Sequence, residues 1–127
     1  MAGPTMATLM KRLRAIALGL PGVVEGTTVH HPSFKVAKTA FVMCMDDHHG
    51  VGWQAIWCKS TRDEQQALIA SDPDRFFAPP YVGPRGWVGM RLHEPLDWTE
   101  VAEMIEDAYR LSAGKRLLAQ LDARRGP

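Results

Sequence analysis

This sequence of 127 residues has no long hydrophobic run and little cysteine. Its longest apolar stretches, such as residues 39–45, are far shorter than the roughly 20 residues that a membrane-spanning helix needs. The two cysteines, Cys44 and Cys58, each lie in an apolar segment with the pattern of a strand, which is typical of reduced, buried thiols. We therefore expect no membrane partner and no disulfide framework.

The first 20 residues do not have the pattern of a secretory signal. Lys11, Arg12 and Arg14 interrupt the apolar positions before a hydrophobic stretch of about 7 to 15 residues can form. The expected location is therefore cytoplasmic.

Charge of one sign is not in excess either. The formal net charge is +1 and the isoelectric point is about 7.9, whereas DNA-binding domains often exceed about 9 and carry clustered Lys and Arg. The glycine-rich loops that bind nucleotide phosphates, Gly-x-Gly-x-x-Gly and Gly-x-x-x-x-Gly-Lys, do not occur. The overall charge therefore indicates no particular partner, and no cofactor is predicted.

The length and composition fit one domain. Hydrophobic residues make up 46% of the sequence and charged residues 23%, both near the average of soluble domains. We treat residues 1–127 as a single domain with a core over about residues 6–121 and frayed ends.

Helical periodicity occurs towards both ends of the sequence. Residues 5–19 place apolar side chains on one helical face, and Gly19 followed by Pro21 is expected to end that helix. Asp97 and Glu100 have capping-box spacing and open a second amphipathic helix. Shorter helical segments are predicted after Thr61 and over residues 115–122.

The central part of the sequence changes to a period of two and is rich in β-branched and aromatic residues. Strands are predicted at residues 27–31, 33–36, 39–45, 51–59 and 87–92. Ala37 and Lys38 can close one hairpin, and the polar residues 46–50 can close the next. Consecutive strands are therefore expected to pair as an antiparallel meander.

Strands in the middle with helices at both ends predict an α+β fold. Each element must bury its apolar side against another layer. The expected architecture is a two-layer sandwich, with an antiparallel sheet of four to five strands and the N- and C-terminal helices packed on one face.

Five short motifs occur together in this sequence: LPGVVEG at residues 20–26, HPSFKV at 31–36, PPYVG at 79–83, RGWV at 85–88 and LDW at 96–98. In their order and spacing they resemble the MmcQ/YjbR family over nearly the whole chain. The resemblance implies a small α+β fold of the kind compared with frataxin-like and secretion-chaperone-like sandwiches. It also implies a DNA-binding assignment that comes largely from fold comparison, and it brings no catalytic residues.

Polar and aromatic side chains on two of these motifs form the candidate ligand or DNA site. Its residues are His31, Ser33, Lys35, Lys38, Tyr81, Arg85 and Trp87. The loop over residues 78–86 contains three prolines and two glycines, so it is expected to hold its side chains rigidly. The alternative is that Tyr81 and Trp87 belong to the core, as Trp53 and Trp57 are predicted to do.

Metal binding and nucleophilic catalysis find little support in the sequence. Neighbouring residues of a strand point to opposite faces, so the pairs His30-His31 and His48-His49 do not readily converge on one ion, and no metal site is predicted. Ser33 or Cys44 would need an adjacent base, which the sequence does not place. They are more simply a turn or strand residue and a core residue.

Three functions remain open. The first hypothesis is a small non-enzymatic binding module that contacts DNA phosphates. The cations available to such a surface are Lys35, Lys38, Lys59, Arg62 and Arg85. The alternative is an adaptor that binds a protein partner, or a second copy, by strand addition. The third is a small-molecule enzyme that uses a cleft with His31, Tyr81 and Arg85.

Overall fold

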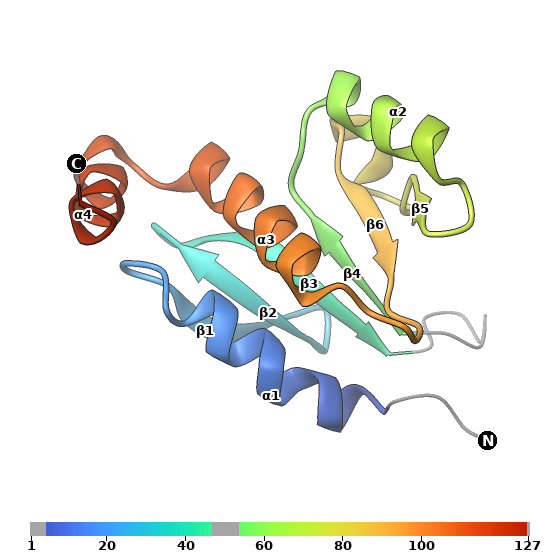
Figure 1. Ribbon diagram of the computed structural model, residues 1–127, viewed down its shortest axis with the longest axis horizontal. Coiled ribbons are helices and arrows are strands. Elements are labelled where there is room, and N and C mark those ends of the chain that lie inside the picture. The colour runs from blue at the N-terminus through green and yellow to red at the C-terminus, as the bar shows by residue number, and fades with distance from the viewer. Residues whose placement is uncertain (1–4, 47–53, 127) are drawn as a thin grey trace.

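An antiparallel sheet of six strands forms the centre of the computed structural model, which describes residues 5–46 and 54–126 (Figure 1). The strands lie in the order β1-β2-β3-β4-β6-β5. Their bounds are Val24–Thr28 (β1), His31–Val36 (β2), Thr39–Asp46 (β3), Gln54–Cys58 (β4), Phe76–Phe77 (β5) and Val88–Arg91 (β6). The predicted fold class is confirmed. The sheet has one strand more than the four to five expected, because the two residues of β5 pair with β6.

The hairpin between β1 and β2 differs from the prediction. The sequence pattern predicts a strand over residues 27–31, but Val29 and His30 form the turn, with φ of 48° and 70°. The prediction is wrong there because neither residue is the Gly, Asn or Asp that usually marks a two-residue turn with positive φ. The predicted hairpin at Ala37 and Lys38, with φ of 52° and 67°, is confirmed.

Residues 47–53 lie outside the described part of the chain. They include most of the predicted turn at residues 46–50, with His48 and His49, and the predicted core residue Trp53. These predictions therefore remain untested.

The helices α1 (Met6–Ala17) and α3 (Trp98–Ser112) lie on the same face of the sheet (Figure 1). The predicted cap of α3 is confirmed, since the Asp97 carboxylate accepts hydrogen bonds from the backbone N–H groups of Thr99 and Glu100. The shorter helices are α2 (Arg62–Ser71), which lies beside β5, and α4 (Lys115–Arg124), which follows α3. None of the helices in the described ranges is long and apolar enough to cross a membrane.

The main hydrophobic core lies between the sheet and these two helices. Leu13 of α1, Phe34 of β2 and Ile105 of α3 are fully buried in it. Tyr109 of α3 is buried as well, and its hydroxyl donates a hydrogen bond of 2.6 Å to the carbonyl oxygen of Pro21. The hydroxyl is therefore satisfied inside the core, and it joins α3 to the turn that follows α1.

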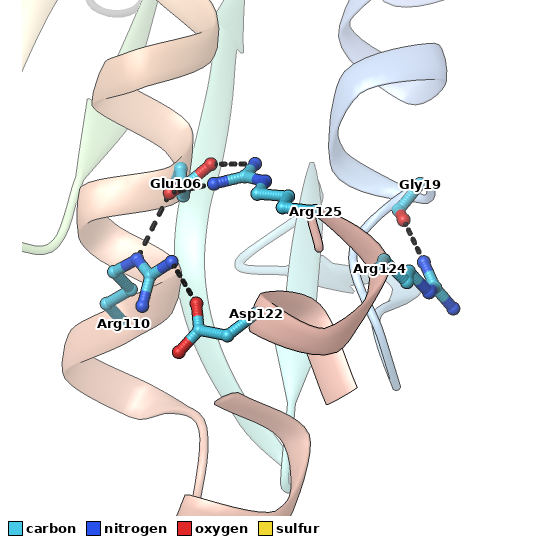
Figure 2. Close-up of polar contacts among 6 residues, drawn as sticks. All are labelled: Gly19, Glu106, Arg110, Asp122, Arg124 and Arg125. Carbon is cyan, nitrogen blue, oxygen red and sulfur yellow. Dashed lines mark hydrogen bonds and ion pairs between the residues drawn. The ribbon is translucent and has the colours of Figure 1, made fainter. Parts of the chain in front are cut away.

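Ion pairs attach α4 to the rest of the fold (Figure 2). Glu106 on α3 accepts hydrogen bonds from Arg110 on the same helix and from Arg125 at the end of α4. Arg110 also donates to Asp122 of α4 at 3.0 Å. Arg124 donates to the carbonyl oxygen of Gly19, just beyond α1, at 2.8 Å. Polar contacts to α1 and α3 therefore hold the last helix in place.

Candidate ligand-binding site

The face of the sheet away from α1 and α3 carries a second, smaller apolar cluster. Met43 and Met45 alternate along β3 with core residues of the other face, and Trp57 is the cross-strand partner of Met43 on β4. Trp87 packs against them and is 8% exposed. This open face is therefore apolar along β3 and β4, although no described long helix covers it.

A rigid loop covers part of the open face. Residues 78–87 contain the short 3-10 helix η2 (Gly83–Arg85) and internal backbone hydrogen bonds. The side-chain amide of Gln65, on α2, donates to the carbonyl oxygens of Gly83 at 2.8 Å and Trp87 at 2.6 Å. Gly86 has a φ of 95° and lies so close to α2 that a Cβ there would come within 2.9 Å of the Arg62 nitrogen. Hydrogen bonds and close packing therefore fix this loop against α2.

An apolar pocket of about 370 Å³ lies between this loop and the β1–β2 hairpin. We call it the open-face pocket. It is lined by Thr28, Val29, His31, Met43, Met45, Trp57, Tyr81 and Val82. Its volume falls at the lower end of the roughly 300–1,000 Å³ of small-molecule sites, and such sites are mostly apolar with a few polar groups. The pocket has the size and lining of a ligand site.

Two exposed apolar side chains stand on opposite sides of the open-face pocket. Val29 and Tyr81 are each 76% exposed, and their φ angles are 48° and 68°. A left-handed backbone costs a non-glycine residue roughly 1–2 kcal/mol, and a β-branched residue such as Val29 is a clear outlier there. Strained residues of this kind cluster at ligand-binding sites. Both borders of the pocket therefore combine backbone strain with exposed apolar surface.

The structure brings two of the seven predicted site residues to this pocket, His31 and Tyr81. Ser33 is fully buried, and its Oγ accepts a hydrogen bond of 2.9 Å from the Thr28 hydroxyl. Trp87 belongs to the apolar cluster beneath the loop, in agreement with the alternative of a core role. These two residues form the support of the site and do not line it.

The three predicted cations lie away from the open-face pocket. Lys38 sits in the β2–β3 turn, at the opposite end of β2 from His31, which is roughly 16 Å along the strand at about 3.3 Å per residue. The Lys35 side chain runs over Gly26, and Arg85 is exposed in η2. The seven residues therefore do not form one cleft.

Sequence reasoning missed several residues of the site. Val29 was hidden because its segment has the alternation of a strand. Met43 and Met45 could have been found, since a period of two places both on the side of Trp57. Gln65 carries no signal in the sequence, because its role depends on two carbonyl groups about 20 residues further along the chain.

The described residues offer neither a reactive thiol nor a group of metal ligands at the pocket. Burial raises the pKa of the Cys44 thiol to about 12, so this cysteine stays protonated at neutral pH. The pKa of Cys58 is raised by the same cause. Within the residues that the structure describes, no group of three or more His, Cys, Asp or Glu side chains could hold a metal ion.

Another hollow, of about 480 Å³, lies between α2 and α3. Its border carries the carboxylates of Glu64, Glu103 and Asp107, and it contains Arg75, which is paired with Glu100. Much of its lining is polar, in contrast to the open-face pocket, and its one guanidinium already has a carboxylate partner.

Comparison with known proteins identifies relatives of this chain. The family model described as YjbR matches residues 18–111. Among solved structures, the fold is similar to the crystal structure of the Deinococcus radiodurans protein DR2400, described as a DUF419 domain. The TM-score is 0.67 and the sequence identity 16%, over 80% of this chain and 76% of that one. No curated protein matches the sequence.

Proposed function

The chain belongs to the YjbR family, and from that premise we propose that it is a non-enzymatic binding protein whose ligand site is the open-face pocket. The observation that carries this proposal is the pair of strained, exposed apolar residues, Val29 and Tyr81, on opposite sides of an apolar pocket. The positive φ of Val29 is that of a two-residue hairpin turn and is shared by Ala37, so the exposure of the two apolar side chains beside the pocket is what a contribution to binding best explains.

The lining of the pocket favours binding over catalysis. Among the lining residues that the structure describes, His31 carries the one imidazole, and none is a carboxylate or a lysine. The hydroxyl of Ser33 is buried beneath the hairpin, and the Cys44 thiol faces the main core on the other side of the sheet. The Thr28 hydroxyl, on the residue paired with His31, donates its proton to Ser33 Oγ, so it is not the hydroxyl–base pair that nucleophilic catalysis needs.

The pocket can be tested by thermal shift with a panel of small neutral and charged compounds. Neutral apolar compounds should raise the melting temperature of the protein, since a ligand that binds only the folded state stabilises it. The substitution Tyr81→Gly should remove this rise, because it deletes one border of the pocket while also relieving the positive φ.

The matched control is Leu111→Ala, which removes an exposed apolar side chain from α3, on the other layer. It should leave the rise unchanged. Stabilisation that persists in Tyr81→Gly, or a panel without any stabilising compound, would contradict the proposal.

Contact with DNA is a second candidate, at a different place. Cations gather at the end of the sheet where the β2–β3 turn and the start of α2 lie, namely Lys38, Lys59, Arg62 and Arg85. They could neutralise phosphates and release counterions. Asp63 and Glu64 lie in the first turn of α2 and reduce this positive charge. The arginines Arg14, Arg75, Arg110 and Arg125 are already paired with carboxylates.

DNA binding can be recognised by the dependence of its affinity on salt concentration. The affinity should fall steeply between about 50 and 200 mM salt, and Lys38→Glu and Arg85→Glu should weaken it for every sequence. Lys11→Glu, on α1, serves as the control with the same change of charge. No binding at low salt would remove this candidate and leave the pocket proposal untouched.

A protein partner is a further alternative, through the edge strand β1. Of the described strands, only β2 pairs with β1, and Val24 on β1 is 60% exposed. An added strand could pair with the other side of β1. Size-exclusion chromatography with light scattering should then show a dimer or a complex, and a monomer at all concentrations would oppose self-association.

A further inference from the structure

The lining of the open-face pocket narrows the chemistry of its ligand, and we infer that the ligand is an uncharged, planar aromatic molecule of about two fused rings. This inference rests on the proposed function, because it assumes that the pocket binds a ligand. It adds the charge, the shape and the size of that ligand, which follow from three separate features of the lining.

The first feature is the absence of charge. None of the eight lining residues within the described ranges 5–46 and 54–126 is Asp, Glu, Lys or Arg. A charged ligand would leave water without gaining an oppositely charged partner, which is unfavourable in an apolar site. The described polar side chains of the lining are those of Thr28, His31 and Tyr81, and the Thr28 hydroxyl donates to Ser33 Oγ.

The second feature is the floor of the pocket, which consists of two thioethers and an indole. Met43, Met45 and Trp57 are 7%, 2% and 4% exposed. Met43 and Met45 stand two positions apart on β3, so both thioethers point from the same face of the sheet. Trp57 lies beside Met43 on the neighbouring strand. Thioethers make favourable contacts with aromatic rings, and aromatic side chains stack on them. An aromatic plane lying on this floor would use both kinds of contact.

The third feature is size. A closed apolar cavity of roughly 150 Å³ is large enough for benzene. The open-face pocket, at about 370 Å³, has more than twice that volume, although it is not a closed cavity and its lining residues Val29 and Tyr81 are exposed. Two fused rings fit this volume, with the polar edge towards the hairpin.

Three bicyclic compounds of similar size distinguish the effect of ligand charge from that of ligand planarity. They are 2-naphthol, which is neutral and flat, 2-naphthoate, which is flat and negatively charged, and decahydro-2-naphthol, which is neutral and not flat. Binding is measured by calorimetry at pH 7, below the pH at which 2-naphthol ionises. We expect 2-naphthol to bind at least roughly tenfold more tightly than either of the others, because only it satisfies both requirements.

Substitutions of lining residues test whether the compounds bind in the open-face pocket. Met45→Leu keeps the approximate volume and removes the sulfur, so the affinity for 2-naphthol should fall several-fold while the affinity for decahydro-2-naphthol changes little. Tyr81→Phe keeps the ring and should retain most of the affinity. Met104→Leu makes the same change in the main core and is the matched control.

The outcomes separate this inference from the proposed function. If decahydro-2-naphthol or 2-naphthoate binds as tightly as 2-naphthol, and Tyr81→Gly abolishes that binding, the pocket is a binding site but the aromatic, uncharged class is wrong. If none of the three compounds binds, the aromatic, uncharged class is contradicted, and the thermal-shift panel decides separately whether the pocket binds a ligand. Tighter binding of 2-naphthol that survives in both Met45→Leu and Tyr81→Gly would also overturn the inference, since the compound would then bind elsewhere.

Discussion

On one face of the sheet, α1 and α3 enclose the apolar side chains almost completely, as in the case of Phe34 and Ile105. On the other face, a short loop covers Trp87, and Val29 and Tyr81 remain exposed beside a pocket. The first arrangement maximises burial. The second leaves apolar surface and strained backbone in place, although neither stabilises the fold. The helix-covered face therefore holds most of the buried apolar surface, and the proposed binding role of the open face rests on this difference.

The largest contrast between the two faces should appear when each loses an aromatic ring. Phe34→Ala, in the main core, should lower the free energy of unfolding by about 3–5 kcal/mol. Tyr81→Gly should change it by less than about 1 kcal/mol, because the ring is exposed and the substitution relieves strain. Urea unfolding measures both. Similar losses for the two variants would show that the open face is a second structural core.

Gln65 tests whether the loop over residues 78–87 depends on α2. Gln65→Leu removes both hydrogen bonds and leaves two buried carbonyl groups without this donor, so it should destabilise the protein by about 2 kcal/mol. Ligand binding at the pocket should weaken as well, because Tyr81 belongs to the same loop. Gln120→Leu, at an exposed position of α4, is the control and should change neither quantity.

The β1–β2 turn at Val29 and the β2–β3 turn at Ala37 have similar backbone angles, but only Val29 lines the open-face pocket. The two turns therefore separate the effect of the backbone from that of the pocket. Val29→Gly should stabilise the protein by about 1 kcal/mol by removing a β-branched residue from a left-handed position, and it should weaken ligand binding. Ala37→Gly changes the equivalent position of the β2–β3 turn and should leave ligand binding unchanged. A loss of binding in Ala37→Gly would mean that turn flexibility, and not the Val29 side chain, controls the site.

The smallest expected change in stability comes from the ion pairs of Glu106, which join α3 to the end of α4. Hydrogen bonds from Arg125, and then from Arg110, hold the pKa of Glu106 below its usual value. Its contribution to stability is therefore fully present above the unfolded pKa of about 4.3 and is lost as the pH falls through the lower folded pKa. Because these side chains are partly exposed, Glu106→Gln should cost at most about 1 kcal/mol at pH 7.

The loss of stability caused by Glu106→Gln should shrink towards pH 3. At each pH, the variant should bind ligand as tightly as the wild-type protein does. Glu103→Gln, at an exposed position on the same helix, provides the comparison. A Glu106→Gln protein with an undiminished deficit at pH 3 would show that the ion pairs are not its cause.

Regular elements of this fold could be predicted because their signals are local. The apolar periodicity of α1, the Asp97 cap and the alternation along β3 each depend on residues a few positions apart. The turn at Val29 could not be predicted. The strand pattern favours an extended backbone there, and Val and His are not residues that usually form a turn with positive φ. There the pairing of β1 with β2 overrides local preference.

The candidate site was harder to predict than the fold because it depends on contacts between distant segments. The proline-rich loop and His31 could be identified as unusual, and both reach the pocket. The cations at Lys35, Lys38 and Arg85 could not be placed, because their positions depend on which end of the sheet each turn occupies. Side-chain chemistry suggested a site, and the strand order decided which residues share it.

Methionine methyl groups report on both faces of the sheet in a single experiment. Met43 and Met45 lie in the open-face pocket, whereas Met10 and Met104 lie in the main core. In a spectrum of protein labelled with carbon-13 at these methyl groups, added 2-naphthol should shift the signals of Met43 and Met45 in a saturable way and leave those of Met10 and Met104 in place. Unchanged signals from Met43 and Met45 at saturating ligand, or equal shifts on both faces, would contradict the assignment of binding to the open face.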